Sequence, residues 1–170
     1  MKRIMVIGVS AGVGKSTFAR KLSEKLDIEV CHLDTLFWKS GWVEATLEEF
    51  TEAQQEIIKK EQWIIEGNYS TTFEIRTEYA DTIIYLELPR YVCLYRVIKR
   101  WLTHIGKKRP DVGCTEKMDW AFIKFIWTTY HPRVKKMKDR FHRLSHEKTI
   151  IVLKGKEEIN AYLKNTLLNK

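Results

Sequence analysis

The sequence predicts a single α/β domain in which a parallel sheet is covered by helices on both faces. Short apolar runs, rich in isoleucine and valine, alternate along the chain with segments whose apolar residues recur at helical spacing. The first such run ends in a glycine-rich turn that leads directly into a helical pattern. With 170 residues and 44% hydrophobic content, the chain can form one core and is too short for two ordinary domains. We therefore expect residues 1–170 to form one domain.

Five strands are expected, and several of the apolar runs that predict them end at a glycine or a proline. Gly8 closes the first run, Gly67 follows the third and Pro89 closes the fourth. A helical pattern follows each strand, which favours parallel pairing through crossover connections. The runs cover residues 3–7, 29–32, 63–66, 82–88 and 149–153.

The helices between these strands are indicated by apolar spacing and by end signals. Phe18 and Leu22 lie four residues apart in the first helix, and Thr46 with Glu49 has the form of a capping box. Pro132 is expected to break or kink the chain between two helical segments. The expected helices cover 15–26, 46–60, a segment after Asn68, 89–101, 120–130, 133–144 and 156–168.

Charge and composition narrow the possible partners and the compartment. A net charge of +8 and a pI of about 9.3 favour polyanionic partners such as nucleotides, nucleic acid or anionic lipid. The three cysteines are widely spaced and no secretory leader is indicated, so we expect no disulfide framework, no zinc site and a cytoplasmic location. No run approaches the roughly 20 apolar residues that span a bilayer. Most of the six tryptophans, Trp120 and Trp127 among them, are expected to pack in the core.

The most informative segment is Gly-Val-Ser-Ala-Gly-Val-Gly-Lys-Ser-Thr at residues 8–17, here called the phosphate loop. It lies between a strand and a helix, where its glycines let successive N–H groups point into one concavity at the positive end of the helix. Lys15 is expected to bridge the β- and γ-phosphates of ATP, and the hydroxyl of Ser16 to bind Mg²⁺. The expected nucleotide contacts are Gly12, Val13, Gly14, Lys15, Ser16 and Thr17.

The phosphate loop departs from the strict pattern at one position. Val9 stands where a glycine is usual, and Gly8 comes one residue earlier. This leaves open whether the loop entrance is reshaped, although the part that contacts phosphates is intact. The alternative, a glycine-rich turn that binds nothing, fits the strand-to-helix context poorly.

Three carboxylates follow predicted strands and are candidates for chemistry. Asp34 comes after the second strand, where it is placed to orient or deprotonate an acceptor hydroxyl; the alternative is a turn cap. Glu66 ends the third strand and is the preferred support for the metal, directly or through water. Glu87 at the end of the fourth strand is its rival, with a solvated or helix-capping acid as the more ordinary interpretation.

Cations that could neutralise phosphoryl charge come from two helices and the segment between them. Arg96 and Arg100 are four residues apart and project from one helix face toward the polar, basic segment 106–116, which predicts a loop. Arg100 and Arg109 are expected to act on the γ-phosphoryl oxygens, with a solvated surface as the alternative. Arg133 is also placed to reach back toward phosphates.

With these residues in view, the chain resembles the adenylate kinase-like small P-loop kinases, and more closely the bacterial DNA topology modulation proteins. The second resemblance covers nearly the whole chain. It rests on His-Leu-Asp-Thr-Leu-Phe-Trp at 32–38, Trp-Ile-Ile-Glu-Gly-Asn-Tyr at 63–69, and residues 100–111 ending in Arg-Pro-Asp.

The resemblance implies a three-layer α/β/α P-loop NTPase fold with a five-stranded parallel sheet, a lid at about 104–118 and an acceptor-binding segment at about 34–60. It implies that Arg96 lies near the adenine, that Arg100 reaches the phosphates, and that Lys154 and Gly155 border the base. Arg76 is expected to contact the acceptor. The expected acceptor-binding residues are Asp34, Trp38, Glu66, Gly67, Asn68, Arg76 and Arg133.

Two departures make an ordinary adenylate kinase doubtful. The acceptor segment lacks an arginine for an acceptor phosphate, and the lid has no four-cysteine cluster. The favoured function is a kinase that transfers the γ-phosphoryl group of ATP to a small molecule, and aromatic residues such as Trp38 suit a flat or apolar acceptor. The alternatives are a nucleic-acid-associated ATPase or regulator of DNA topology, and a slow ATP-dependent switch that serves a protein partner.

Overall fold

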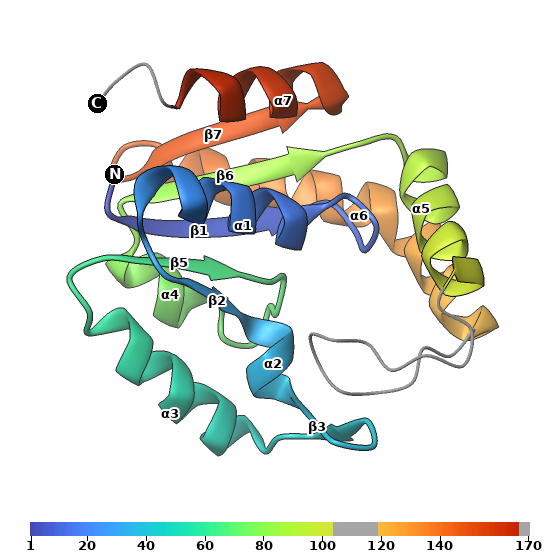
Figure 1. Cartoon of the computed structure of the whole chain (residues 1–170), viewed down its shortest axis with the longest axis horizontal. Coiled ribbons are helices and arrows are strands. Elements are labelled where there is room, and N and C mark those ends of the chain that lie inside the picture. Colours follow the sequence, from blue (N-terminus) through green and yellow to red (C-terminus); the bar gives the residue numbers. More distant parts are fainter. Residues whose placement is uncertain (104–118, 167–170) are drawn as a thin grey trace.

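The structure is a computed structural model that describes residues 1–103 and 119–166. Its main sheet has five strands, all parallel, in the order β2-β5-β1-β6-β7, as Figure 1 shows. This confirms the predicted α/β class and the five-stranded parallel sheet. The strands are β1 (Arg3–Gly8), β2 (Val30–His32), β5 (Trp63–Glu66), β6 (Thr82–Glu87) and β7 (Thr149–Lys154).

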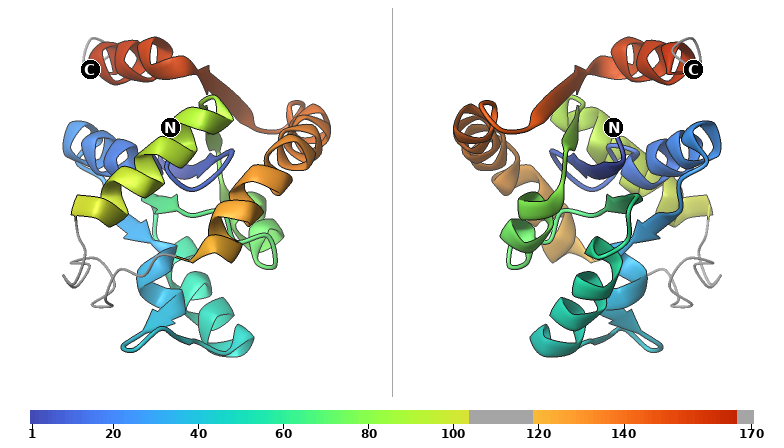
Figure 2. Two further views of the ribbon diagram at one scale, coloured as in Figure 1. Left: turned by 90° about the vertical axis from the view of Figure 1, so that its right-hand side faces the viewer. Right: turned by 90° about the vertical axis from the view of Figure 1, so that its left-hand side faces the viewer.

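Helices cover both faces of the sheet (Figure 2). On one face α1 packs beside α7, where the rings of Phe18 and Tyr162 stack with centroids 6.1 Å apart. On the other face α6 lies against β6, where Tyr85 meets Phe141 edge-on at 5.2 Å. The helices of these two layers are α1 (Lys15–Leu26), α7 (Gly155–Asn165), α4 (Phe73–Tyr79) and α6 (Trp120–Leu144).

The remaining elements extend from the sheet. α5 packs on α6, and α3 packs on α4. Between β2 and α3 the chain forms a short helix and a two-stranded antiparallel hairpin, β3-β4. Their bounds are α2 (Leu33–Phe37), β3 (Trp38–Lys39), β4 (Val43–Glu44), α3 (Leu47–Ile58) and α5 (Arg90–Thr103).

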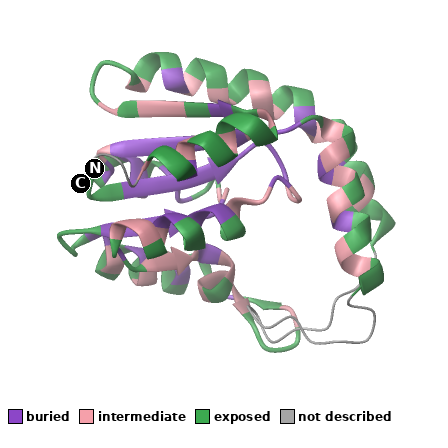
Figure 3. Cartoon of the chain, turned by 45° about the horizontal axis from the view of Figure 1, so that its top comes forward, coloured by how far each residue is buried: buried purple, intermediate pink, exposed green. Residues whose placement is uncertain are grey.

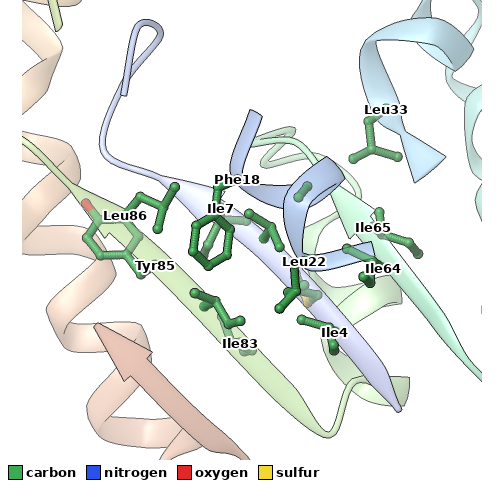
Figure 4. Packing of buried hydrophobic residues seen from close by; sticks show 14 of the residues in the cluster. Ile4, Ile7, Phe18, Leu22, Leu33, Ile64, Ile65, Ile83, Tyr85 and Leu86 are labelled. Carbon is green, nitrogen blue, oxygen red and sulfur yellow. The ribbon is translucent and has the colours of Figure 1, made fainter. Parts of the chain in front are cut away.

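The core lies between the central strands and the helices that flank them. β1 reads Arg-Ile-Met-Val-Ile-Gly and is buried at every position after Arg3, as expected for a parallel strand covered on both faces. Phe18 and Leu22, four residues apart on α1, point down onto this sheet (Figure 4). Figure 3 shows the resulting pattern, with buried central strands and helices that are exposed on their outer sides.

Most expected boundaries agree with the structure to within a few residues. The capping box is confirmed, because the Glu49 N–H donates to Thr46 Oγ1 at 3.2 Å and the Thr46 N–H donates to Glu49 Oε2 at 2.9 Å. The helix that follows ends at Ile58, and β6 ends at Glu87, one residue before the expected end. The segment 104–118, which includes the predicted lid and Arg109, lies outside the described residues.

Of the break or kink that was expected at Pro132, the break is wrong. α6 runs without interruption from Trp120 to Leu144 with Pro132 inside it. A proline removes one hydrogen-bond donor from a helix, and that loss is local. Tyr130 and Phe141, on either side of the proline, are both buried, so packing holds the two parts of α6 in one helix.

The expected core packing of the tryptophans is wrong for two of them. Trp63 is buried on β5, but Trp120 is 77% exposed and Trp127 is 48% exposed. The first turns of α6 are apolar on several sides, and only the face that carries Ile126 and Tyr130 is buried. Trp127 instead lies under the guanidinium group of Arg90, whose Cζ atom is 3.4 Å from the ring centroid.

Candidate functional site

The phosphate loop connects β1 to α1 at the carboxyl edge of the sheet (Figure 1). Gly12 and Gly14 have φ angles of 78° and 99°, in the left-handed region that favours glycine. A Cβ atom on Gly12 would lie 2.3 Å from the carbonyl oxygen of Cys93 on α5, so the backbone of the loop approaches that helix closely. The loop thus has the conformation and the position, at the N-terminus of α1, that anion binding requires.

Val9, where the usual pattern has a glycine, comes directly after β1 and is still hydrogen-bonded to β6. Its side chain is fully buried, and its N–H donates to the carbonyl oxygen of Leu86 at 2.9 Å, which continues the pairing of β1 with β6. The substitution is therefore accommodated in the core.

Glu66 contacts two residues of the phosphate loop. The hydroxyl of Ser16 donates to Glu66 Oε2 at 3.0 Å, and Lys15 Nζ lies 3.9 Å from Glu66 Oε1. Burial by itself would raise the pKa of Glu66, but the hydrogen bond from His32, the charge of Lys15 and the hydroxyl of Ser16 together lower it. The carboxylate is therefore ionised and directed at the two loop residues that were predicted to act on phosphate and metal.

His32 is a member of this cluster that the sequence did not indicate. Its Nδ1 atom is 2.9 Å from Glu66 Oε2, and because an ionised carboxylate only accepts, His32 is the donor. The two residues are direct neighbours in the parallel register of β2 and β5. The sequence shows a histidine at the end of one predicted strand and an acid at the end of another. These positions predict a contact only once it is known that the two strands are neighbours in the sheet.

The loop after β5 is tied to the phosphate loop by its backbone and by Asn68. The side-chain oxygen of Asn68 accepts the N–H of Gly8 at 2.9 Å, and the N–H of Gly67 donates to the carbonyl oxygen of Val6 at 3.1 Å. Gly67 and Asn68 were expected to bind the acceptor. In the structure their hydrogen bonds fix the entrance of the phosphate loop.

Asp34 lies on α2, directly after the edge strand β2. Its Oδ1 atom accepts a hydrogen bond from the hydroxyl of Tyr69 at 2.7 Å. Burial, together with the negative charge of Asp34, raises the pKa of Tyr69, so the phenol stays protonated and remains a donor. Because parallel strands end at one edge of the sheet, Asp34 and Glu66 belong to the same side of the molecule as the phosphate loop.

Arg76 differs most from its expected role. Its side chain is fully buried, and it donates to the carbonyl oxygens of Gly67 at 3.0 Å and Tyr69 at 2.7 Å. Burial lowers the pKa of Arg76 to about 10. The guanidinium group therefore supports the loop that carries Asn68 and Tyr69, and its contact with the acceptor stays a prediction.

The other predicted cations are spread around this edge. Arg96 supports the phosphate loop from α5, with Nη1 3.2 Å from the carbonyl oxygen of Val13. Arg100 is half-buried one turn further along the same helix. Arg133 packs over Phe125, 4.7 Å from the ring centroid, and burial lowers its pKa. Lys154 ends β7 and Gly155 begins α7, and the Lys154 N–H donates to Glu158 Oε2 at 2.7 Å.

The donor set fits a magnesium ion that is held jointly with a nucleotide. Among the described residues, no group of three or more His, Cys, Asp and Glu side chains could hold a metal ion. Mg²⁺ needs no such cage, because it keeps several waters and binds one or two protein oxygens together with phosphates. The hydroxyl of Ser16 and the carboxylate of Glu66, 3.0 Å apart, supply oxygen ligands of that kind.

Helices in the described part of the chain are too short or too polar to cross a membrane. Two of the hollows in the surface, of about 440 and 250 Å³, are not lined by the phosphate loop, although the second adjoins His32. The first adjoins Lys2 and Asp81 near the start of β1, and the second lies along the outer edge of β2. The functional assignment therefore depends on the side chains at the carboxyl edge of the sheet.

Comparison with solved structures shows the fold again. The chain is similar to a presumed kinase from Chloroflexus aurantiacus J-10-fl, with 16% identity, a TM-score of 0.59 and 96% of each chain covered. It is also similar to shikimate kinase from Bacteroides thetaiotaomicron, with 19% identity, a TM-score of 0.53 and 99% of each chain covered. A sugar kinase from Janibacter sp. HTCC2649 is similar over 99% of this chain and 91% of its own (15%, 0.53). No family model and no curated protein matches the sequence.

The chain shares the α/β fold of these structures, with a five-stranded parallel sheet, and it carries the phosphate loop between β1 and α1. These three solved structures are a presumed kinase, a shikimate kinase and a sugar kinase, at identities that establish the shared fold alone. The activity has to be inferred from the site.

Proposed function

We propose that the protein is a kinase that transfers the γ-phosphoryl group of ATP to a hydroxyl group of a small molecule. One observation supports this above the others: Lys15 and Ser16 of the phosphate loop both face the ionised carboxylate of Glu66. A glycine-rich turn without a ligand has no need for a buried carboxylate beside a lysine and a helix-start hydroxyl. A nucleotide phosphate with its magnesium ion needs all three.

The residues divide between the two substrates. N–H groups of the phosphate loop and the N-terminus of α1 bind the phosphates of ATP, and Lys15 neutralises charge on the β- and γ-oxygens. Ser16 and Glu66 hold Mg²⁺, which when bound supplies further neutralisation of phosphate charge. Asp34 accepts the proton of the acceptor hydroxyl while the oxygen of that hydroxyl forms a bond to the γ-phosphorus. The bond between the γ-phosphorus and the oxygen of the leaving ADP breaks.

The supporting residues keep these groups in place. The Tyr69 hydroxyl orients the carboxylate of Asp34 by donating to its Oδ1 atom. Arg96 and Asn68 hold the backbone of the phosphate loop from its two sides. Positioning of this kind accounts for most of the catalytic effect in phosphoryl transfer, because little covalent chemistry is left to the protein.

The test is the release of ADP from magnesium and ATP in the presence of nucleosides, nucleoside monophosphates and hydroxylated metabolites. We expect one acceptor class to accelerate ADP release, and Lys15→Ala to lower that rate by about 10²-fold or more. Lys21→Ala, an exposed lysine on the outer side of α1, is the matched control and should keep the full rate. Hydrolysis that no small acceptor changes would contradict the proposal.

The same assay repeated with DNA, together with a DNA-binding measurement, separates two other functions. The resemblance to DNA topology modulation proteins stays a prediction, because it rests on sequence motifs alone. DNA binding that persists near physiological salt, together with ATP hydrolysis that DNA accelerates, would favour an ATPase of that kind. Slow hydrolysis that responds to neither DNA nor small molecules would favour an ATP-dependent switch.

A further inference from the structure

An aromatic wall stands beside Asp34, formed by Phe37, Trp38, Trp42 and Tyr69, and it packs against the buried ring of Phe50. Phe37 is at its centre, with ring centroids 5.0 Å from Trp38 and 4.8 Å from Tyr69. Tyr69 is also the residue whose hydroxyl binds Asp34. If a ligand places a hydroxyl group at Asp34, the rest of the ligand therefore contacts these aromatic side chains.

The outer part of this wall is held in a strained conformation. Trp42 has a φ angle of 64°, in the left-handed region where a bulky side chain is rare, and its ring meets Trp38 edge-on at 5.3 Å. Such backbone strain persists where the surrounding structure requires it, often at ligand sites. The short β3-β4 hairpin thus presents two half-buried tryptophans next to each other.

The electrostatic character of this segment opposes that of the whole chain. The protein carries a net charge of +8, yet residues 33–58 contain six acidic residues and a single lysine, Lys39. Lys39 is bound to both carboxylate oxygens of Glu49, at 2.8 and 2.7 Å. Glu44 is the direct partner of Trp38 in the antiparallel hairpin, so the two side chains share one face.

We propose that the acceptor is a hydroxylated molecule with a flat ring and without a negatively charged group. This inference rests on the proposed function and names the substrate class of the same site. Aromatic rings and carboxylates together favour neutral or cationic flat molecules, because the faces of the rings attract positive charge. An acceptor with a phosphate or carboxylate would bring a like charge against Asp34 and Glu44, which costs binding free energy.

Matched pairs of acceptors test this directly. Nucleosides are compared with their 5′-monophosphates, and aromatic alcohols that carry an amino group are compared with the same alcohols carrying a carboxylate. We expect kcat/KM for ADP formation to be higher for the neutral or cationic member of each pair, by about tenfold or more. Faster transfer to the anionic members would overturn the inference and leave the kinase activity standing. If no member of any pair accelerates ADP formation, both the proposed function and this inference fail.

A pair of charge reversals separates the local effect of the wall from net charge. Glu44→Lys places a cation on the hairpin face of Trp38, whereas Glu52→Lys makes the same change at an exposed position of α3. We expect Glu44→Lys to reduce the preference for uncharged acceptors several-fold, and Glu52→Lys to leave it unchanged. KM for ATP should be the same in both variants and in the wild type, which verifies that they are folded. Equal effects of the two variants would overturn the assigned role of the hairpin face.

Discussion

The hydroxyl of Ser16 donates a hydrogen bond to Glu66 Oε2 at 3.0 Å, which joins the first turn of α1 to the end of β5. Ser16 stands at the start of α1 and Glu66 at the end of β5, which pairs with β1 in parallel. The strand pairing thus places a carboxylate opposite the first turn of α1. Because the hydroxyl already has an acidic partner, a magnesium ion bound there would exchange one hydrogen bond for two oxygen ligands.

Replacing Glu66 should weaken magnesium binding more than nucleotide binding. Glu66→Gln keeps the size of the side chain and removes its charge, and we expect the concentration of Mg²⁺ needed for half-maximal activity to rise about 10- to 100-fold. ATP binding measured by calorimetry in the presence of EDTA should change little. Glu87→Gln, at the end of β6, is the control for a strand-end acid. A larger effect at Glu87 would mean that the metal support was assigned to the wrong strand.

His32 should act on the reaction only through Glu66. His32→Ala removes a donor to a buried carboxylate, so we expect kcat to fall about tenfold at saturating magnesium and ATP. His32→Asn offers an amide N–H from nearly the same position and should restore most of the rate. Failure of asparagine to restore activity, with ATP binding intact, would indicate that the imidazole takes part in proton transfer.

The close approach of the phosphate loop to α5 predicts that substitution by alanine destabilises the fold to different extents at two glycines with similar φ angles. Gly12 (φ 78°) would place a Cβ atom 2.3 Å from the Cys93 carbonyl oxygen, whereas Gly41 (φ 83°) has nothing within 4 Å. We expect Gly41→Ala to cost about 1 kcal/mol of unfolding free energy, from backbone strain. Gly12→Ala should cost at least about 2 kcal/mol and weaken ATP binding. Chemical denaturation and calorimetry measure both, and equal costs would refute the steric account.

The sequence predicts the phosphate loop and the strand-end acids well because these signals are local. Strand, glycine turn and helix follow one another within 26 residues, and Glu66 ends an apolar run of the expected length. The roles of His32 and Arg76 depend instead on tertiary neighbours. His32 meets Glu66 only because β2 pairs with β5, and Arg76 is buried because the loop at residues 67–69 folds back over α4. Periodicity and spacing carry no information on either contact.

Arg76 should be essential for stability rather than for recognition of the acceptor. Arg76→Ala would leave the carbonyl oxygens of Gly67 and Tyr69 without their buried donor, at a cost of about 1–3 kcal/mol each. We expect a large loss of unfolding free energy in chemical denaturation, and little change from Arg143→Ala on the exposed side of α6. A folded, equally stable Arg76→Ala protein with a raised KM for its acceptor would restore the role that the sequence suggested.

Asp81 should make the stability of the fold dependent on pH in the acidic range. Its Oδ2 atom accepts the N–H groups of Lys2 and Arg3, at 2.8 and 2.9 Å, which fixes the start of β1 beside β6. Partial burial would raise the pKa of Asp81, but the hydroxyl of Thr82 and these two N–H groups lower it below the usual 3.8.

A carboxyl with a lowered pKa stabilises the fold above its ordinary pKa, and that contribution is lost as the pH falls through the folded-state value. The difference in unfolding free energy between wild type and Asp81→Asn should therefore be constant from neutral pH to about pH 5 and shrink below pH 4. A difference that stays constant to pH 2 would contradict the assignment.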